Sequence, residues 1–174
     1  MIEKILLSEE KILSWGMGTR GKRKAIKPYP AKEDQENIVT ETIFRYHTMY
    51  DNPVSLLAMS KKGLNAKAAL DFILVSGFTY EEFQETFKTT VKTIQNYAVQ
   101  DLKLDAALSE KLLKSFSLFE QGIEVFGSAK AFHEWLNISS IGLGGQIPFE
   151  LMDTITGITL IEEELVRIAY GALA

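Results

Sequence analysis

The residue types that carry out chemistry in proteins are sparse in this chain. It contains no cysteine, which excludes a disulfide scaffold, a thiol nucleophile and a thiolate metal site. Its two histidines, His47 and His133, stand far apart and have no partner ligand at helical spacing. No G-x-S-x-G sequence or comparable nucleophile pattern is present. We therefore expect no catalytic residue, no metal ion and no cofactor.

A glycine-rich stretch, SSIGLGGQIP, is the remaining place where a ligand-binding loop could form. It contains Gly142, Gly144 and Gly145. A phosphate-binding P-loop would also need a Lys-Ser/Thr pair and a preceding strand, and the sequence offers neither. The pattern favours a tight loop that lets two helices pack, and an enzyme that uses this loop is the least favoured function.

Residues 80–97 have the spacing of a helix-turn-helix. Two short helices are predicted there, joined by a turn of about three residues and supported by a helix over residues 66–76. In the second helix, TVKTIQNY, the side chains of Val91, Ile94 and Tyr97 point inward. The outward-facing side chains are suited to DNA binding, because Gln and Asn can pair with adenine while Lys and Thr contact phosphates or base edges. The candidate DNA-binding residues are Lys88, Thr90, Lys92, Thr93, Gln95 and Asn96. The alternative is a three-helix core with a polar outer face.

Local start and stop signals predict the helices that position these residues. A helix is expected near residues 33–49, and Asn52 followed by Pro53 begins the next one, which Gly63 ends. The helix over residues 66–76 ends at Gly77, and its buried face is expected to consist of Ala69, Leu70, Ile73 and Leu74. Thr79 and Glu82 form a capping box, and Thr90 caps the recognition helix.

The C-terminal half is also predicted to be helical. Asp105 caps a helix of about five turns that Gly127 ends. Its apolar stripe is Leu108, Leu112, Phe116, Phe119, Ile123 and Phe126. A short helix through Phe132 and Trp135, the glycine-rich loop and a turn at residues 149–152 follow. The last helix runs from about Ile158 to Gly171, with Ile158, Ile161, Leu165 and Ile168 inside and Glu162, Glu163 and Arg167 outside. No stretch alternates with period two, so the predicted fold is all-α.

Composition and charge narrow the class of protein further. The chain has 174 residues, of which 46% are hydrophobic and 24% charged, as in a globular protein. Residues 101–174 carry five Lys/Arg against eleven Asp/Glu, which suits a basic protein partner or simply a solvated surface. No apolar run reaches the roughly 18 residues of a membrane span, and no signal-peptide pattern is visible, so we expect a cytoplasmic protein without a membrane partner.

From about residue 52 onward, the sequence resembles the Xre/MbcA/ParS-type antitoxins, the partners of RES-domain toxins in bacterial type II toxin–antitoxin pairs. The stretches that carry the resemblance are GLNAKAALDFILVSGFTYEEF, LSEKLLKSFSLFEQGIEVFG, AFHEWLN, GLGGQIPFELMDTITG and RIAYGALA. The resemblance implies a variable N-terminal region over residues 1–50, an Xre-like helix-turn-helix domain over 51–100 and a helical toxin-binding domain over 101–174. It also implies a homodimer that binds the operator DNA of its own operon and a RES-domain toxin that consumes NAD.

The end of the chain fits the toxin-binding role that the resemblance implies. The tail Tyr170-Gly171-Ala172-Leu173-Ala174 is poor core material, yet it can enter a cleft. By resemblance, the cleft is the NAD pocket of the toxin, where a terminal carboxylate or nearby glutamates would meet phosphate-binding arginines. The candidate toxin-binding residues are Gly144, Gly145, Gln146, Arg167, Tyr170, Gly171 and Ala174. The alternative is a frayed C-terminus.

A second function stays open beside that of an antitoxin. The chain could be a stand-alone helix-turn-helix transcription regulator whose C-terminal domain dimerises or senses a small molecule. In either case, basic residues within 20–27 would add phosphate contacts to the operator. An adjacent reading frame that encodes a RES-domain protein would favour the antitoxin.

Overall fold

The computed structural model describes residues 32–171, with side chains from residue 36 onward. Within this range the chain consists of helices and loops without a β-strand, which confirms the all-α prediction. The elements are α1 (Lys32–His47), α2 (Pro53–Lys62), α3 (Lys67–Ser76), α4 (Tyr80–Phe87), α5 (Val91–Val99), α6 (Ala106–Phe126), α7 (Ala129–Leu136), the 3-10 turn η1 (Ile141–Leu143), α8 (Pro148–Leu151) and α9 (Ile155–Ala169).

The helix starts predicted from capping residues are confirmed. The side chains of Asn52, Thr79, Thr90 and Asp105 each accept a hydrogen bond from the backbone N–H three residues further along. Glu82 completes the capping box by accepting the N–H of Thr79 at 2.7 Å. These hydrogen bonds satisfy donors that a helix start would otherwise leave unpaired, so the caps define where the helices begin.

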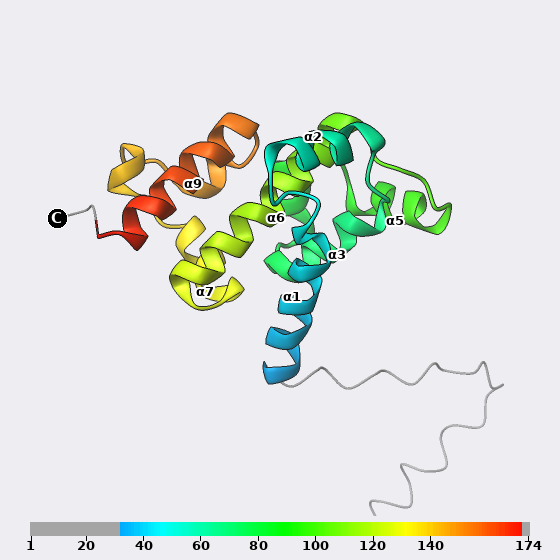
Figure 1. The fold of residues 1–174 in the computed structure, drawn as a ribbon. Helices are drawn as coiled ribbons and strands as arrows, with labels where there is room; N and C mark the ends of the chain where they lie inside the picture. Colours follow the sequence, from blue (N-terminus) through cyan, green and yellow to red (C-terminus); the bar gives the residue numbers. More distant parts are fainter. Residues whose placement is uncertain (1–31, 172–174) are drawn as a thin grey trace, which may run out of the picture. The chain divides into compact units, whose positions relative to one another are not determined.

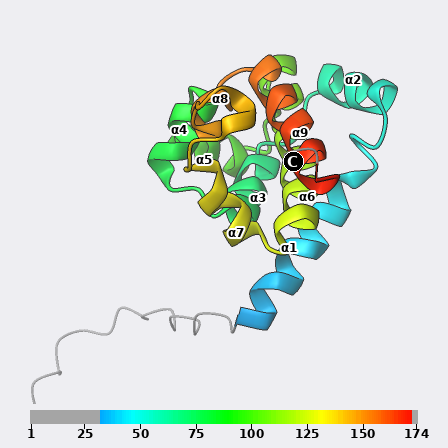
Figure 2. The same ribbon diagram turned by 90° about the vertical axis from the view of Figure 1, so that its left-hand side faces the viewer.

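Helix α6 connects the two halves of the described chain. It packs against α1, α2, α3, α7 and α9 (Figures 1 and 2). Leu112, Phe116 and Phe119 of its predicted stripe are fully buried. The ring of Phe72 from α3 makes edge-to-face contacts with Phe116 and Phe119, so one aromatic core continues from α3 into α6. Residues on both sides of position 100 therefore contribute to one compact unit.

The buried face of α3 differs from the prediction. Phe72 and Val75 lie in the core, whereas Leu74 is 55% exposed and Leu70 and Ile73 are only partly buried. The reason is the composition of this helix, KAALDFILVS, in which nearly every position is apolar. Hydrophobic spacing cannot identify one face of such a helix. The neighbours decide it, and α3 packs against α1, α5, α6 and α7.

Three further details of the prediction are wrong. Helix α9 begins at Ile155, earlier than expected, because the Thr154 side chain accepts the N–H of Gly157. Glu162, expected outside, has a side chain only 14% exposed and pairs with Lys114 at 3.0 Å. Tyr97, expected inside, is 40% exposed.

Candidate functional site

The predicted DNA-binding residues lie on α5 and in the turn before it. Lys92, Gln95 and Asn96 are exposed, and their spacing puts them on one side of α5. Thr90 caps α5 and its hydroxyl also lies 2.9 Å from the hydroxyl of Thr93, which is half-buried. Lys88 ends α4, so α4 and α5 are separated by the short turn that a helix-turn-helix requires.

The part of this surface that belongs to α4 is acidic. A groove of about 400 Å³ separates α4 from the start of α5, and the carboxylates of Glu81 and Glu85 line it together with Lys92. These acids would repel a phosphate backbone on the α4 side. Any attraction to DNA within α4 and α5 would therefore come from Lys92 and from Lys88 in the turn.

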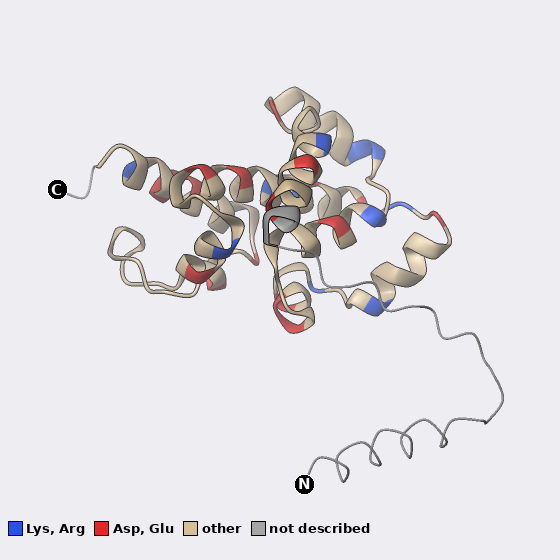
Figure 3. Ribbon diagram, turned by 90° about the horizontal axis from the view of Figure 1, so that it is seen from below, with Lys and Arg blue, Asp and Glu red and all other residues tan. Residues whose placement is uncertain are grey.

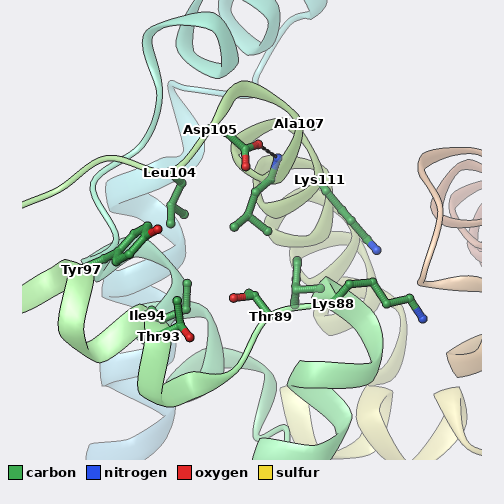
Figure 4. Close-up of a pocket in the computed structure, with 11 residues that line it drawn as sticks. Lys88, Thr89, Thr93, Ile94, Tyr97, Leu104, Asp105, Ala107 and Lys111 are labelled. Carbon is green, nitrogen blue, oxygen red and sulfur yellow. Dashed lines mark hydrogen bonds between the residues drawn. The ribbon is translucent and has the colours of Figure 1, made fainter.

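A second groove, of about 390 Å³, lies between the α4–α5 turn and the start of α6 (Figure 4). Lys88 pairs with the carboxylate of Asp153 at 3.6 Å, and Lys111 donates to the backbone oxygen of Asp153 at 2.6 Å and to that of Thr86. Figure 4 shows both amino groups directed to the same side, away from Tyr97. Burial lowers the pKa of Lys111 to about 8, against the opposing effect of Asp153. The two lysines thus connect the turn to the segment just before α9.

The glycine-rich loop closes on itself beside α9, as the sequence predicts for a tight loop. Ser140 donates its N–H to the carbonyl oxygen of Gln146 at 2.9 Å, and Gly145 donates to that of Ser140 at 2.8 Å. Gly144 and Gly145 have φ values of 69° and 82°, which residues with a side chain rarely adopt. We refer to residues 140–146 as the glycine loop.

A buried carboxylate fastens the glycine loop to α9. The side chain of Glu164 is fully buried, and it accepts hydrogen bonds from the Ser140 hydroxyl at 2.8 Å and from the Nε of Arg167 at 2.7 Å. Arg167 also donates to the carbonyl oxygen of Gly142 at 3.4 Å. Sequence reasoning missed Glu164, which ends an acidic run of three residues. Its spacing of three from Ile161 and four from Ile168 puts it at the edge of the buried stripe of α9, and this is the signal that could have found it.

The predicted toxin-binding residues that the structure describes gather where the glycine loop meets the C-terminal end of α9. Arg167 contacts this loop directly, and Tyr170, which ends α9, is 85% exposed. The glycine loop also carries a large apolar side chain that the sequence did not single out, since Ile141 is 92% exposed. Ala174 lies outside the described residues, as do the basic residues within 20–27.

The histidines make ordinary polar contacts. His47 lies 3.0 Å from a carboxylate oxygen of Glu120, and His133 lies 3.0 Å from one of Glu82. Burial alone would raise the pKa of Glu82, but hydrogen bonds from Thr79 and His133 hold it below its usual range. In the part of the chain that the structure describes, no three potential ligands lie close enough to hold a metal ion, and no helix is long and apolar enough to span a membrane.

Comparison with known proteins gives two matches. Residues 121–171, which run from the last turns of α6 to the residue after Tyr170, match the family described as the antitoxin Xre/MbcA/ParS C-terminal toxin-binding domain. The chain is also 26% identical over 141 residues to the Prs ADP-ribosylating antitoxin of Sphingobium sp. (strain YBL2), an alignment that covers 75% of this chain and 89% of that protein. The resemblance to the Xre/MbcA/ParS-type antitoxins is confirmed. The glycine loop, Glu164 and Arg167 all lie in the matched toxin-binding domain, and both matches support antitoxin function.

Proposed function

We propose that this chain is an antitoxin that binds and neutralises a cognate RES-domain toxin, and that it represses its own operon as a homodimer through α4 and α5. The observation that carries the toxin-binding part is the gathering of the glycine loop, Arg167 and Tyr170 at one exposed end of the matched domain. Such an antitoxin needs no catalytic residue of its own, because occupying the pocket of the toxin is sufficient.

The charge of this domain supports a basic partner surface. Residues 101–174 carry six more acids than bases, from eleven Asp/Glu and five Lys/Arg. Figure 3 shows acidic residues along α9, the helix that presents Arg167 and Tyr170. Glu164 is buried and Glu162 is paired with Lys114, which leaves Glu163 as the exposed acid of α9. A toxin pocket that binds the phosphates of NAD must carry positive charge, so the acidic domain as a whole would be complementary to it.

Operator binding is supported by the exposed polar side of α5. Gln95 and Asn96 can read base edges, while Lys92 can contact a phosphate. One such short helix offers little contact area and little positive charge. A two-fold dimer would place two recognition helices on half-sites about one helical turn of DNA apart, which compensates for both.

Two truncations test the toxin-binding proposal. Ending the chain after Ala169 removes Tyr170 and the tail but keeps Arg167 on the glycine loop, whereas ending it after Val166 also removes Arg167. We expect the first to weaken protection of cells that express the RES-domain toxin from the same operon, and the second to abolish it. Both should retain operator binding, because α4 and α5 are untouched.

The outcome of these truncations locates the inhibitory surface. Full protection by the chain ending after Ala169 would move that surface from the tail to the glycine loop. Full protection by both truncated chains would exclude the C-terminal end of α9 altogether. If the parent chain fails to bind the RES-domain protein of its own operon, the proposed function is wrong.

A further inference from the structure

The glycine loop is held by one side chain of another element as well as by its own backbone hydrogen bonds. Its Leu143 packs against the core, whereas Ile141, the first residue of η1, is 92% exposed. We propose that Glu164 is a positioning residue that holds this loop, and with it Ile141, in the conformation that the toxin binds. The inference rests on the proposed function and adds to it the side chain that holds the contact surface in place before the toxin binds.

Both carboxylate oxygens of Glu164 are engaged by groups that define the loop. Oε1 accepts from the Ser140 hydroxyl, at the point where the loop opens, and Oε2 accepts from Arg167. Arg167 also donates to the carbonyl oxygen of Gly142, the middle residue of η1. A buried charged pair is a poor source of stability, because well-packed apolar residues often do as well. What this pair provides is a defined position for residues 140–142.

The absence of a side chain at residue 142 points to the same contact. Unlike Gly144 and Gly145, Gly142 does not have a positive φ, so its backbone conformation is open to any residue. A Cβ at this position would instead overlap the carboxylate of Glu164. A side chain at 142 would therefore have to displace the Glu164 carboxylate, and the effects of substitutions at the two positions should depend on each other.

The side chain that this arrangement presents is suited to a protein partner. Ile141 exposes a large apolar surface to solvent next to Gly142, whose carbonyl oxygen accepts from Arg167. Burying this surface against a toxin would be favourable, and a loop already held in place loses less conformational entropy on binding. A loop released from Glu164 would have to be ordered by the toxin, which lowers affinity.

The test compares Glu164→Ala, Glu164→Gln, Ser140→Ala and Gly142→Ala in the full chain. Two quantities are measured: hydrogen exchange of the Gly145 amide in the free protein, and affinity for the RES-domain protein of the same operon. We expect Glu164→Ala to speed exchange and to weaken affinity about tenfold, since it leaves Ser140 and Arg167 without their partner. Glu164→Gln keeps an acceptor for Ser140 and should lie nearer the parent.

Two comparisons separate positioning from a general loss of stability. Glu120→Ala removes a paired carboxylate outside α9 and outside the matched domain, that of the contact with His47, and should leave the Gly145 amide and the toxin affinity unchanged. Gly142→Ala should weaken affinity in the parent but have little further effect in the Glu164→Ala background.

The results that would overturn the inference are equally specific. Parental exchange at Gly145 in Glu164→Ala would show that the carboxylate does not hold the loop. Faster exchange with parental affinity would show that the toxin does not need the preset loop. If the parent itself does not bind the toxin, the proposed function fails, and the presetting role fails with it.

Discussion

At the scale of single residues, Lys88 and Asp101 are the non-glycine residues of the described chain with a positive φ, and Lys88 lies in the turn between α4 and α5. This residue ends α4 with φ 55° and ψ 28°, a left-handed conformation that costs a non-glycine residue about 1 kcal/mol. Its ion pair with Asp153 contributes little to stability, because the two side chains are 64% and 42% exposed. The turn between the predicted DNA-binding helices is thus less stable than it would be with glycine.

Lys88→Gly is therefore expected to raise the free energy of unfolding by about 0.5–1 kcal/mol. The measurement is urea unfolding at neutral pH. Lys88→Ala is the matched control, because it removes the same charge and keeps the strained backbone. Equal stability of the two variants would show that the strain is not there.

Lys111 makes stability depend on pH in the alkaline range. The folded chain releases its proton near pH 8, whereas an unfolded lysine holds it up to about pH 10.5. Between these values the unfolded state binds more protons, so stability should rise with pH. Burial raises the pKa of Tyr46 and Tyr50, and above their ordinary value of 10.0 this reverses the trend, because the folded state then retains their protons.

We expect the free energy of unfolding, measured by urea titration in steps of pH, to rise from pH 8 and to fall again above the ordinary tyrosine value of 10.0. Lys111→Met should flatten the rise of the free energy of unfolding from pH 8 and keep its fall above pH 10.0. A parent chain whose stability is flat or declines from pH 8 onward would contradict the assignment.

The sequence separation between hydrogen-bond partners explains which residues could be predicted. Asn52, Thr79 and Asp105 cap helices by bonding to residues three positions away, so their role is written in adjacent sequence. Glu164 bonds to Ser140 across a separation of 24 residues. Only the packed fold brings these two side chains together, which is why the most informative contact of the candidate site was invisible in the sequence.

At the scale of elements, the packing of α7 on α6 depends on one small residue. Gly122 lies inside α6, and a Cβ there would overlap the ring of Phe132, which is fully buried in α7. Glycine weakens a helix interior by about 1 kcal/mol relative to alanine. Close approach of the two helices outweighs this cost, since the Phe132 ring contacts Phe119 and Trp135 as well.

Gly122→Ala should accordingly destabilise the chain by about 1–3 kcal/mol despite the better helix propensity of alanine. Glu124→Ala, at an exposed position on the same helix, should change stability by no more than about 0.5 kcal/mol. Thermal and urea unfolding of both variants measure this. A more stable Gly122→Ala chain would mean that α7 does not pack on α6 at this distance.

The recognition side of α5 leads to a prediction about specificity. Lys92→Ala should weaken binding to all DNA sequences and reduce the salt dependence by about one unit of slope. Gln95→Ala and Asn96→Ala should instead cost about 1–3 kcal/mol on the operator and relax sequence preference. Titrations with the upstream region and with unrelated DNA at several salt concentrations measure both effects.

Lys130→Ala, which removes an exposed lysine from α7, is the control for Lys92→Ala and should bind the operator like the parent. If all three α5 variants also bind like the parent, α5 is not the recognition helix. Sequence reasoning found the start of α5 because Thr90 caps it, and it identified Val91 and Ile94 as buried, but the helix continues to Val99. The same reasoning failed for the face of α3, where nearly all positions are apolar.

At the scale of the whole molecule, the proposed operator binding requires two copies of the chain. Light scattering at micromolar concentration should give the mass of a dimer, because one α5 is too small a contact for operator affinity. A monomeric mass both with and without operator DNA would contradict the proposed mode of repression.

The position of α6 has a consequence for how long the protein survives in a cell. Since α6 packs against α2 and α3 as well as α7 and α9, neither half of residues 32–171 can open without exposing the core of the other. A protease that cleaves opened chains would then act on the rare, largely unfolded state rather than on a loose half. A toxin bound at the end of α9 would make that state rarer, so it would lengthen the lifetime of the distant α4–α5 surface along with its own binding site.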